Sequence, residues 1–97
     1  MENITLYNLG TVNKNRLHLK SKNGLMTIWF SYSTPVAFQA TLNGGITVNG
    51  GSSEFWTRQN DWGTTTGKFL NNLQPDKKKR ITGDKFEKYL TEALSQL

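Results

Sequence analysis

Residues 25–32 read Leu-Met-Thr-Ile-Trp-Phe-Ser-Tyr, and this stretch decides the expected fold. Successive side chains of a β-strand point to opposite faces, so the even-numbered positions share one face and the odd-numbered positions the other. Large apolar residues stand on both faces, which is typical of a strand that is covered on both sides. Residues 25–32 are therefore predicted to form the central strand of a sheet.

Shorter alternating runs surround this strand and are separated by turn residues. The runs lie at residues 4–6, 17–19, 36–40, 46–48 and 55–58. Asn-Gly pairs, which favour tight hairpin turns, stand at 23–24, 43–44 and 49–50. Pro35 has no N–H to donate and is expected to mark a break or an edge before residue 36. The pattern predicts an antiparallel meander of about five strands.

The periodicity becomes helical after Gly63. Phe69, Leu70 and Leu73 are spaced for a short helix behind the threonines at 64–66, any of which would serve as its cap, and the helix is expected to end at residues 74–76.

A second helical pattern begins at Gly83, with Thr82 as its expected cap. Its apolar stripe consists of Phe86, Tyr89, Leu90, Ala93, Leu94 and Leu97. Such a stripe requires a surface to cover, so the expected fold is α+β. We expect one domain over residues 1–97, in which the meander is followed by a short helix and by a C-terminal amphipathic helix packed on the sheet.

Composition excludes several classes of function. The 97 residues contain no cysteine and a single histidine, His18, so disulfide frameworks, zinc-thiolate sites and two-histidine metal sites are ruled out. The apolar runs are too short to span a bilayer, and the first residues do not look like a secretory signal. The expectation is a soluble protein of the cytoplasm. Its net charge of +5 favours a partner that carries negative charge.

Basic residues form two groups. Residues 77–80 read Lys-Lys-Lys-Arg between the two predicted helices, where they would contact phosphate or form an ordinary solvated surface. Lys20 and Lys22 are expected to project to one side of a strand, together with Lys14 and Arg16. The alternative role of this second group is to protect a sheet edge from aggregation.

Two tryptophans flank an arginine at Trp56, Arg58 and Trp62. Flat rings beside a guanidinium suit stacked bases, and they equally suit a protein interface. For at least one of the pair the alternative is a core position under a loop, and Trp29 in the central strand is expected to be core.

The segment 63–68 reads Gly-Thr-Thr-Thr-Gly-Lys but is not a phosphate-binding loop, which needs four residues between its glycines and a hydroxyl after the lysine. Exposed amides at this helix start, beside Lys68, would attract a backbone phosphate or simply be capped. The acidic residues show no catalytic pairing. We therefore expect no enzymatic activity, no cofactor and no metal.

Two segments resemble a family of short proteins of unassigned activity encoded by phages, plasmids and other mobile elements. Residues 31–37 are similar to its Ser-Tyr-x-Thr-x-Val-Ala segment, and residues 62–68 to its aromatic followed by Thr-Thr-x-Lys. Phe69 stands where that family commonly has histidine. The resemblance covers roughly residues 25–73 and implies a mobile-element origin and a sheet followed by helices. It supplies no catalytic residues.

Two functions are compatible with these features. One is a small, non-enzymatic nucleic-acid-binding accessory protein of a phage or mobile element. The other is an anti-CRISPR-like inhibitor that binds the effector protein of a host defence nuclease, or the surface with which the effector binds nucleic acid. The candidate contact residues for either partner are Lys20, Lys22, Trp56, Arg58, Trp62, Lys68, Lys77, Lys78, Lys79 and Arg80.

Overall fold

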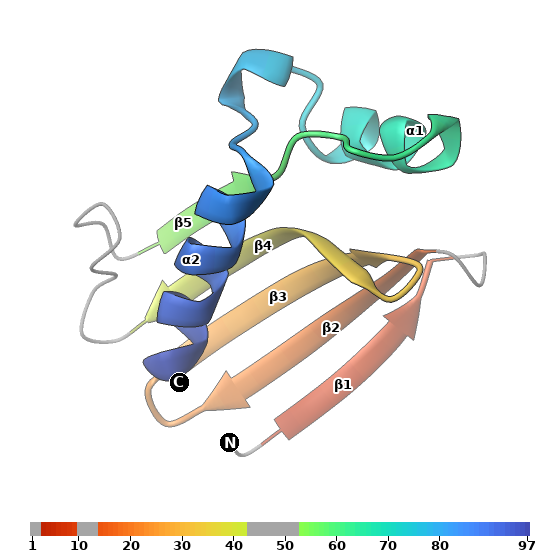
Figure 1. The fold of residues 1–97 in the computed structure, drawn as a ribbon. Helices are drawn as coiled ribbons and strands as arrows, with labels where there is room; N and C mark the ends of the chain where they lie inside the picture. The colour runs from red at the N-terminus through yellow and green to blue at the C-terminus, as the bar shows by residue number, and fades with distance from the viewer. Residues whose placement is uncertain (1–2, 10–13, 43–52) are drawn as a thin grey trace.

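A five-stranded antiparallel meander forms the body of the protein (Figure 1). The computed structural model describes residues 3–9, 14–42 and 53–97. In their order across the sheet, the strands are β1 (Asn3–Asn8), β2 (Lys14–Ser21), β3 (Gly24–Ser31), β4 (Thr34–Leu42) and β5 (Ser53–Thr57). The α+β fold and the central place of β3 are thus confirmed. The predicted run at 46–48 and the turns that begin at Asn43 and Asn49 lie outside the described residues.

Two helices follow the sheet, α1 (Thr64–Leu73) and α2 (Gly83–Ser95), with a short 3-10 helix η1 (Lys77–Lys79) between them. The predicted cap of α2 is confirmed, because Thr82 Oγ1 accepts a hydrogen bond from the Lys85 amide at 3.4 Å. The prediction that a threonine caps α1 is wrong. Gly63 is the N-cap and makes no side-chain capping bond, since the threonines already lie inside the first turn. No helix in the described ranges has the length and apolar character that crossing a membrane requires.

Helix α2 lies across one face of the sheet and builds the main core there (Figure 1). The buried members are Leu19, Met26, Ile28, Phe38, Ala40 and Leu42 from the strands and Phe86, Leu90 and Ala93 from the helix. The rings of Phe38 and Phe86 have their centroids 5.7 Å apart. Leu94 stands at the margin of the predicted stripe and is exposed instead of buried. The predicted packing of the helix on the sheet is otherwise confirmed.

A β-bulge redirects the start of β4 towards α1. Register between β3 and β4 shifts between Trp29 and Phe30, which leaves Val36 as the extra residue. Val36 is fully buried against Phe69 and Leu70 of α1, and Trp29 packs half-buried against the same cluster. Pro35 lies inside β4 at this bulge, so the strand begins earlier than predicted, because a bulge tolerates the missing N–H.

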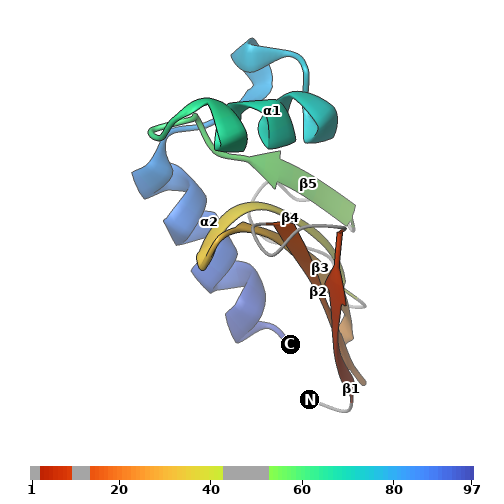
Figure 2. The same cartoon turned by 90° about the vertical axis from the view of Figure 1, so that its right-hand side faces the viewer.

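The two faces of the sheet are covered unequally. Figure 2 shows α2 along one side and α1 at one end, while no described helix lies along the other side of the strands. Side chains on that second side remain exposed or half-buried over most of its area. We call it the open face. Its exposed and half-buried members include Thr5, Tyr7, Arg16, His18, Lys20, Leu25, Thr27, Trp29, Gln39, Thr41 and Phe55, whereas Ala37 and Thr57 on the same side are buried.

Candidate functional site

The predicted contact residues do not share one surface. Lys20 is exposed on the open face, whereas Trp56 lies on the α2 face, where its ring centroid is 5.0 Å from that of Tyr89. Lys22 belongs to the turn after β2, so strand alternation does not align it with Lys20. The expectation that both lysines continue one stripe along a strand is therefore wrong.

Arg80 contradicts the expectation that the whole basic run is solvated. Its side chain is buried, and its guanidinium donates to the Gln74 carbonyl from Nε at 3.2 Å and from Nη2 at 2.8 Å. Nη2 also donates to Asn71 Oδ1 at 2.8 Å. Buried charge requires such partners, and here it ties the end of α1 to the segment that leads into α2. Arg80 is a structural residue.

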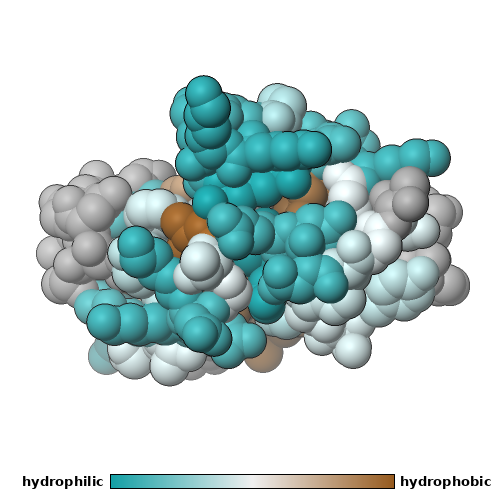
Figure 3. Space-filling model, turned by 45° about the horizontal axis from the view of Figure 1, so that its top comes forward, coloured by the Kyte–Doolittle hydropathy of each residue, from teal (hydrophilic) through white to brown (hydrophobic). Residues whose placement is uncertain are grey.

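Lys77, Lys78 and Lys79 are exposed on η1, and Lys68 is exposed on α1. Seen from the end of the molecule that carries η1 and α1, hydrophilic residues dominate the surface (Figure 3). A polar hollow of about 360 Å³ lies at this end, lined by Gln59, Asn60, Gly67, Asn71, Lys77 and Arg80. The lysines of η1 therefore form a separate basic surface beside this hollow.

Arg58 is also buried, contrary to its predicted place on a contact surface. Its Nη2 lies 3.2 Å from Asp61 Oδ2, and its Nη1 lies 3.7 Å from Glu87 Oε1. The guanidinium carbon stands 4.6 Å from the ring centroid of Trp62. Gly83 makes room for this arrangement, because a Cβ atom there would collide with the guanidinium. Arg58 thus holds the Trp62 indole in place and is not free to contact a partner.

The open face contains aromatic residues that the sequence reasoning missed. Strand register places Tyr7 opposite Arg16, and Arg16 opposite Trp29, in one row across the sheet. The Arg16 guanidinium carbon lies 5.1 Å from the Tyr7 ring centroid. In the adjacent row His18 and Phe55 lie on the same face, and the His18 and Tyr7 ring centroids are 4.9 Å apart. Only the register reveals this grouping, since Tyr7 and Phe55 are far apart in the sequence.

Charge on the open face is of one sign within the described part of the chain. Its charged side chains are Arg16 and Lys20, with Lys14 continuing the same column of β2. Glu54 points to the α2 face, and the other described acids belong to the loops and to α2. In the described ranges, no group of histidine, cysteine, aspartate or glutamate side chains has an arrangement that could hold a metal ion.

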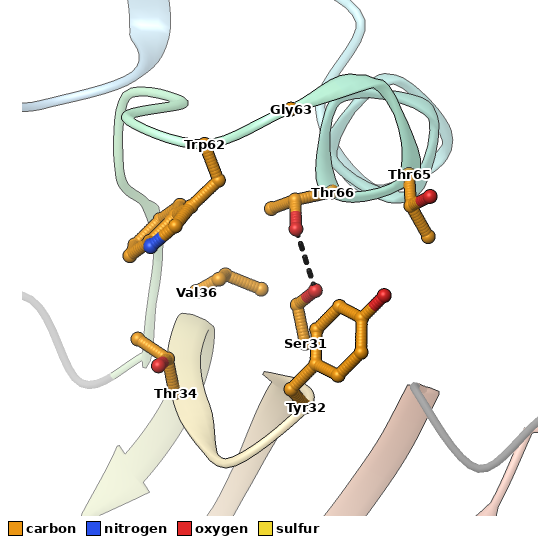
Figure 4. Close-up of a pocket in the computed structure, with 8 residues that line it drawn as sticks. All are labelled: Ser31, Tyr32, Thr34, Val36, Trp62, Gly63, Thr65 and Thr66. Carbon is orange, nitrogen blue, oxygen red and sulfur yellow. Dashed lines mark hydrogen bonds between the residues drawn. The ribbon is translucent and has the colours of Figure 1, made fainter.

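The two segments that carry the resemblance to mobile-element proteins meet at a pocket. It has a volume of about 350 Å³ and is lined by Ser31, Tyr32, Thr34, Val36, Trp62, Gly63, Thr65 and Thr66. We call it the aromatic pocket. In Figure 4, Trp62 and Tyr32 stand on its two sides, with Val36 between them. Ser31 Oγ and Thr66 Oγ1 are 2.7 Å apart and join the segments by a buried hydrogen bond.

Comparison with known proteins assigns the chain to a family. Residues 3–88 match the family of unknown function DUF8033. The chain belongs to this family. The matched region contains the whole described sheet and both segments of the aromatic pocket. No curated protein and no solved structure matches the chain. Membership in DUF8033 carries no activity, so a function must be argued from the geometry.

Tyr32 of this DUF8033 chain has an unusual backbone conformation. Its φ of +57° lies in the left-handed region, and it is the one non-glycine residue with positive φ among those described. It occupies the tight turn between β3 and β4, at a position where such turns favour glycine. A left-handed conformation costs an L-residue roughly 1–2 kcal/mol. This strained turn places the Tyr32 ring, which is 57% exposed, at the rim of the aromatic pocket.

Replacing Tyr32 by glycine should stabilise the protein. Glycine relieves the left-handed strain, and its greater freedom in the unfolded chain offsets only part of that gain, so we expect the free energy of unfolding to rise by about 0.5–1 kcal/mol. Urea unfolding followed by tryptophan fluorescence measures the change. Tyr32→Ala is the control, because it removes the ring and keeps the strain. A Tyr32→Gly protein no more stable than Tyr32→Ala would refute the strain argument.

Proposed function

We propose that this chain is a non-enzymatic protein that binds single-stranded nucleic acid on the open face of its sheet. One observation carries the proposal: the exposed rings of Tyr7 and Phe55 and the half-buried Trp29 share that face with Arg16 and Lys20, and no described acid lies there. Exposed aromatic rings on a sheet stack on bases, and neighbouring cations contact the phosphates between them. β1 and β5 are separated by four inter-strand spacings, about 19 Å, which is room for several nucleotides.

The proposal keeps the predicted class of function and changes the surface. Of the ten residues predicted from the sequence, Lys20 is on the open face. The lysines of η1 belong to the separate basic surface beside the polar hollow, and the buried Arg58 and Arg80 would not contact a strand on the open face. Because the matched family has no assigned activity, the expected origin in a phage or other mobile element also stays a prediction.

Charge removal from the open face tests this function. We expect Arg16→Gln combined with Lys20→Gln to weaken binding of fluorescein-labelled single-stranded DNA or RNA about 25-fold at 0.1 M salt. The slope of log K against log salt is negative and should become shallower by about 1.4, because each of the two lost phosphate contacts on a single strand contributes about 0.7. Fluorescence anisotropy over a series of salt concentrations measures both quantities.

The matched control combines Lys85→Gln with Lys88→Gln, which lowers the net charge equally. Both lysines are exposed on α2, across the sheet from the open face. The control should keep the wild-type slope. If the two pairs of substitutions lower affinity equally, attraction is diffuse and the open face is not the binding surface.

A protein partner is the second candidate, as in the predicted inhibitor of a host defence nuclease. The observation that favours it lies on the α2 side of β1, where Ile4 is 67% and Leu6 64% exposed because α2 does not reach this edge. No described strand pairs with the outer edge of β1, which has no charged residue. Such an edge can accept a strand from another protein. Substitution of Leu6 would then weaken a protein complex and spare nucleic-acid binding.

A further inference from the structure

We propose that the aromatic pocket binds one unpaired nucleobase, with the ring of the base against Trp62. The inference rests on the proposed function, since a bound strand would supply the base, and it names a second contact site away from the open face. The volume of about 350 Å³ lies within the range of small-molecule pockets. The lining contains no lysine, arginine or acidic side chain, so it suits a neutral ring and not a phosphate.

The Trp62 wall is supported from within the protein. The Arg58 guanidinium carbon lies 4.6 Å from the indole centroid and pairs with Asp61 and Glu87, while 42% of the Trp62 surface remains exposed. A ring fixed in this way loses little conformational entropy when a base stacks on it. Tyr32, kept at the opposite rim by its strained backbone, supplies the second aromatic surface.

The floor of the pocket offers a polar edge. Ser31 and Thr66 are both buried, and each hydroxyl has the other as its hydrogen-bond partner at 2.7 Å. One of the two hydroxyls donates this bond and the other accepts it, so the accepting hydroxyl still has a hydrogen that it can donate to a ligand in the pocket. The ring nitrogens and carbonyl oxygens at the edge of a nucleobase are suitable acceptors for it.

The pocket adjoins the basic column of the open face. Ser31 pairs in register with Lys14, and Lys14 follows Arg16 in the column of β2 that also holds Lys20. Residues two apart on a strand are about 7 Å apart, so the pocket begins one step beyond the row of Arg16 and Trp29. A strand whose phosphates follow this column can therefore place a base in the aromatic pocket.

Indole N–H resonances separate the two sites. The chain has three tryptophans, and they report on three surfaces: Trp29 on the open face, Trp62 at the aromatic pocket and Trp56 on the α2 face. We would titrate ¹⁵N-labelled protein with uncharged nucleosides, namely adenosine, guanosine, cytidine and uridine, and with ribose as the control without a base. At least one nucleoside should shift the Trp62 resonance in a saturable way and leave Trp56 unchanged. Ribose should shift neither.

Two variants complete the test. Tyr32→Gly should fold, since the strain is relieved, and should weaken nucleoside binding about tenfold or more through loss of one stacking surface. Trp56→Phe, a ring change on the α2 face, should bind nucleosides as the wild type does.

The outcomes distinguish the base site from the open face. If oligonucleotides bind and shift Trp29, but no nucleoside shifts Trp62 and Tyr32→Gly binds oligonucleotides normally, the base site is wrong and the proposed function stands. If nucleosides shift Trp62 and no oligonucleotide binds, the base site stands with free nucleosides or nucleotides as its ligands, and the proposed function is wrong. Ribose binding as tightly as the nucleosides would overturn base recognition.

Discussion

Replacing Phe86 by alanine should lower the free energy of unfolding by about 3–5 kcal/mol. Phe86 is fully buried where α2 meets the sheet, and its ring packs on Phe38 with the Arg58 guanidinium carbon 5.9 Å from its centroid. Small domains have only about 5–15 kcal/mol of stability in total, so the loss would be a large share of it. Urea unfolding followed by circular dichroism measures the change.

Leu94→Ala is the control on the same helix. Leu94 is exposed, so its substitution should change the free energy of unfolding by no more than about 0.5 kcal/mol. Equal losses for Phe86→Ala and Leu94→Ala would show that α2 does not dock on the sheet through the face described above.

Tyr7→Ala should weaken binding of single-stranded DNA or RNA about 5- to 150-fold. Tyr7 is exposed on the open face beside Arg16 and His18, and loss of one base-stacking contact costs about 1–3 kcal/mol. Because β1 is an edge strand and the ring is outside the core, the sheet should survive the change. Fluorescence anisotropy at one fixed salt concentration measures the affinity.

Two controls test whether the loss of affinity comes from the ring and from the open face. Tyr7→Phe keeps the ring and should bind within about threefold of wild type. This limit allows for the variation of about 0.5 kcal/mol that surface substitutions ordinarily cause. Leu6→Ala removes an exposed side chain from the same strand but from the other face, and should leave the affinity unchanged. If Leu6→Ala weakens nucleic-acid binding as much as Tyr7→Ala does, the open face is not the binding surface.

The elements of this fold could be predicted because apolar residues repeat with a different period in strands and in helices. Alternation places β3 at the centre of the sheet, and helical spacing with Thr82 in front of it places α2, as the structure confirms. The start of β4 and the cap of α1 could not be predicted in the same way. A bulge accommodates Pro35, and Gly63 serves as the N-cap of α1 without a side-chain bond, so tertiary packing overrides the local preference at both places.

The candidate site was less predictable than the fold. Of the predicted contact residues, Trp62 and Lys20 are exposed, whereas Arg58 and Arg80 are buried with partners. Charge in a sequence does not show whether the folded protein already satisfies it. Tyr7 carried no signal of its own, because its place beside Arg16 depends on the pairing of two strands.

The amino-acid sequence by itself therefore determined the type and order of the elements and the apolar side of each, together with an excess of positive charge. Tertiary structure alone decided which face of the sheet α2 leaves open, which cations stay free, and that residues 31–36 meet residues 62–66 at the aromatic pocket. The reason is physical. Periodicity records the environment of one element, whereas register and helix docking depend on surface that two distant segments bury together.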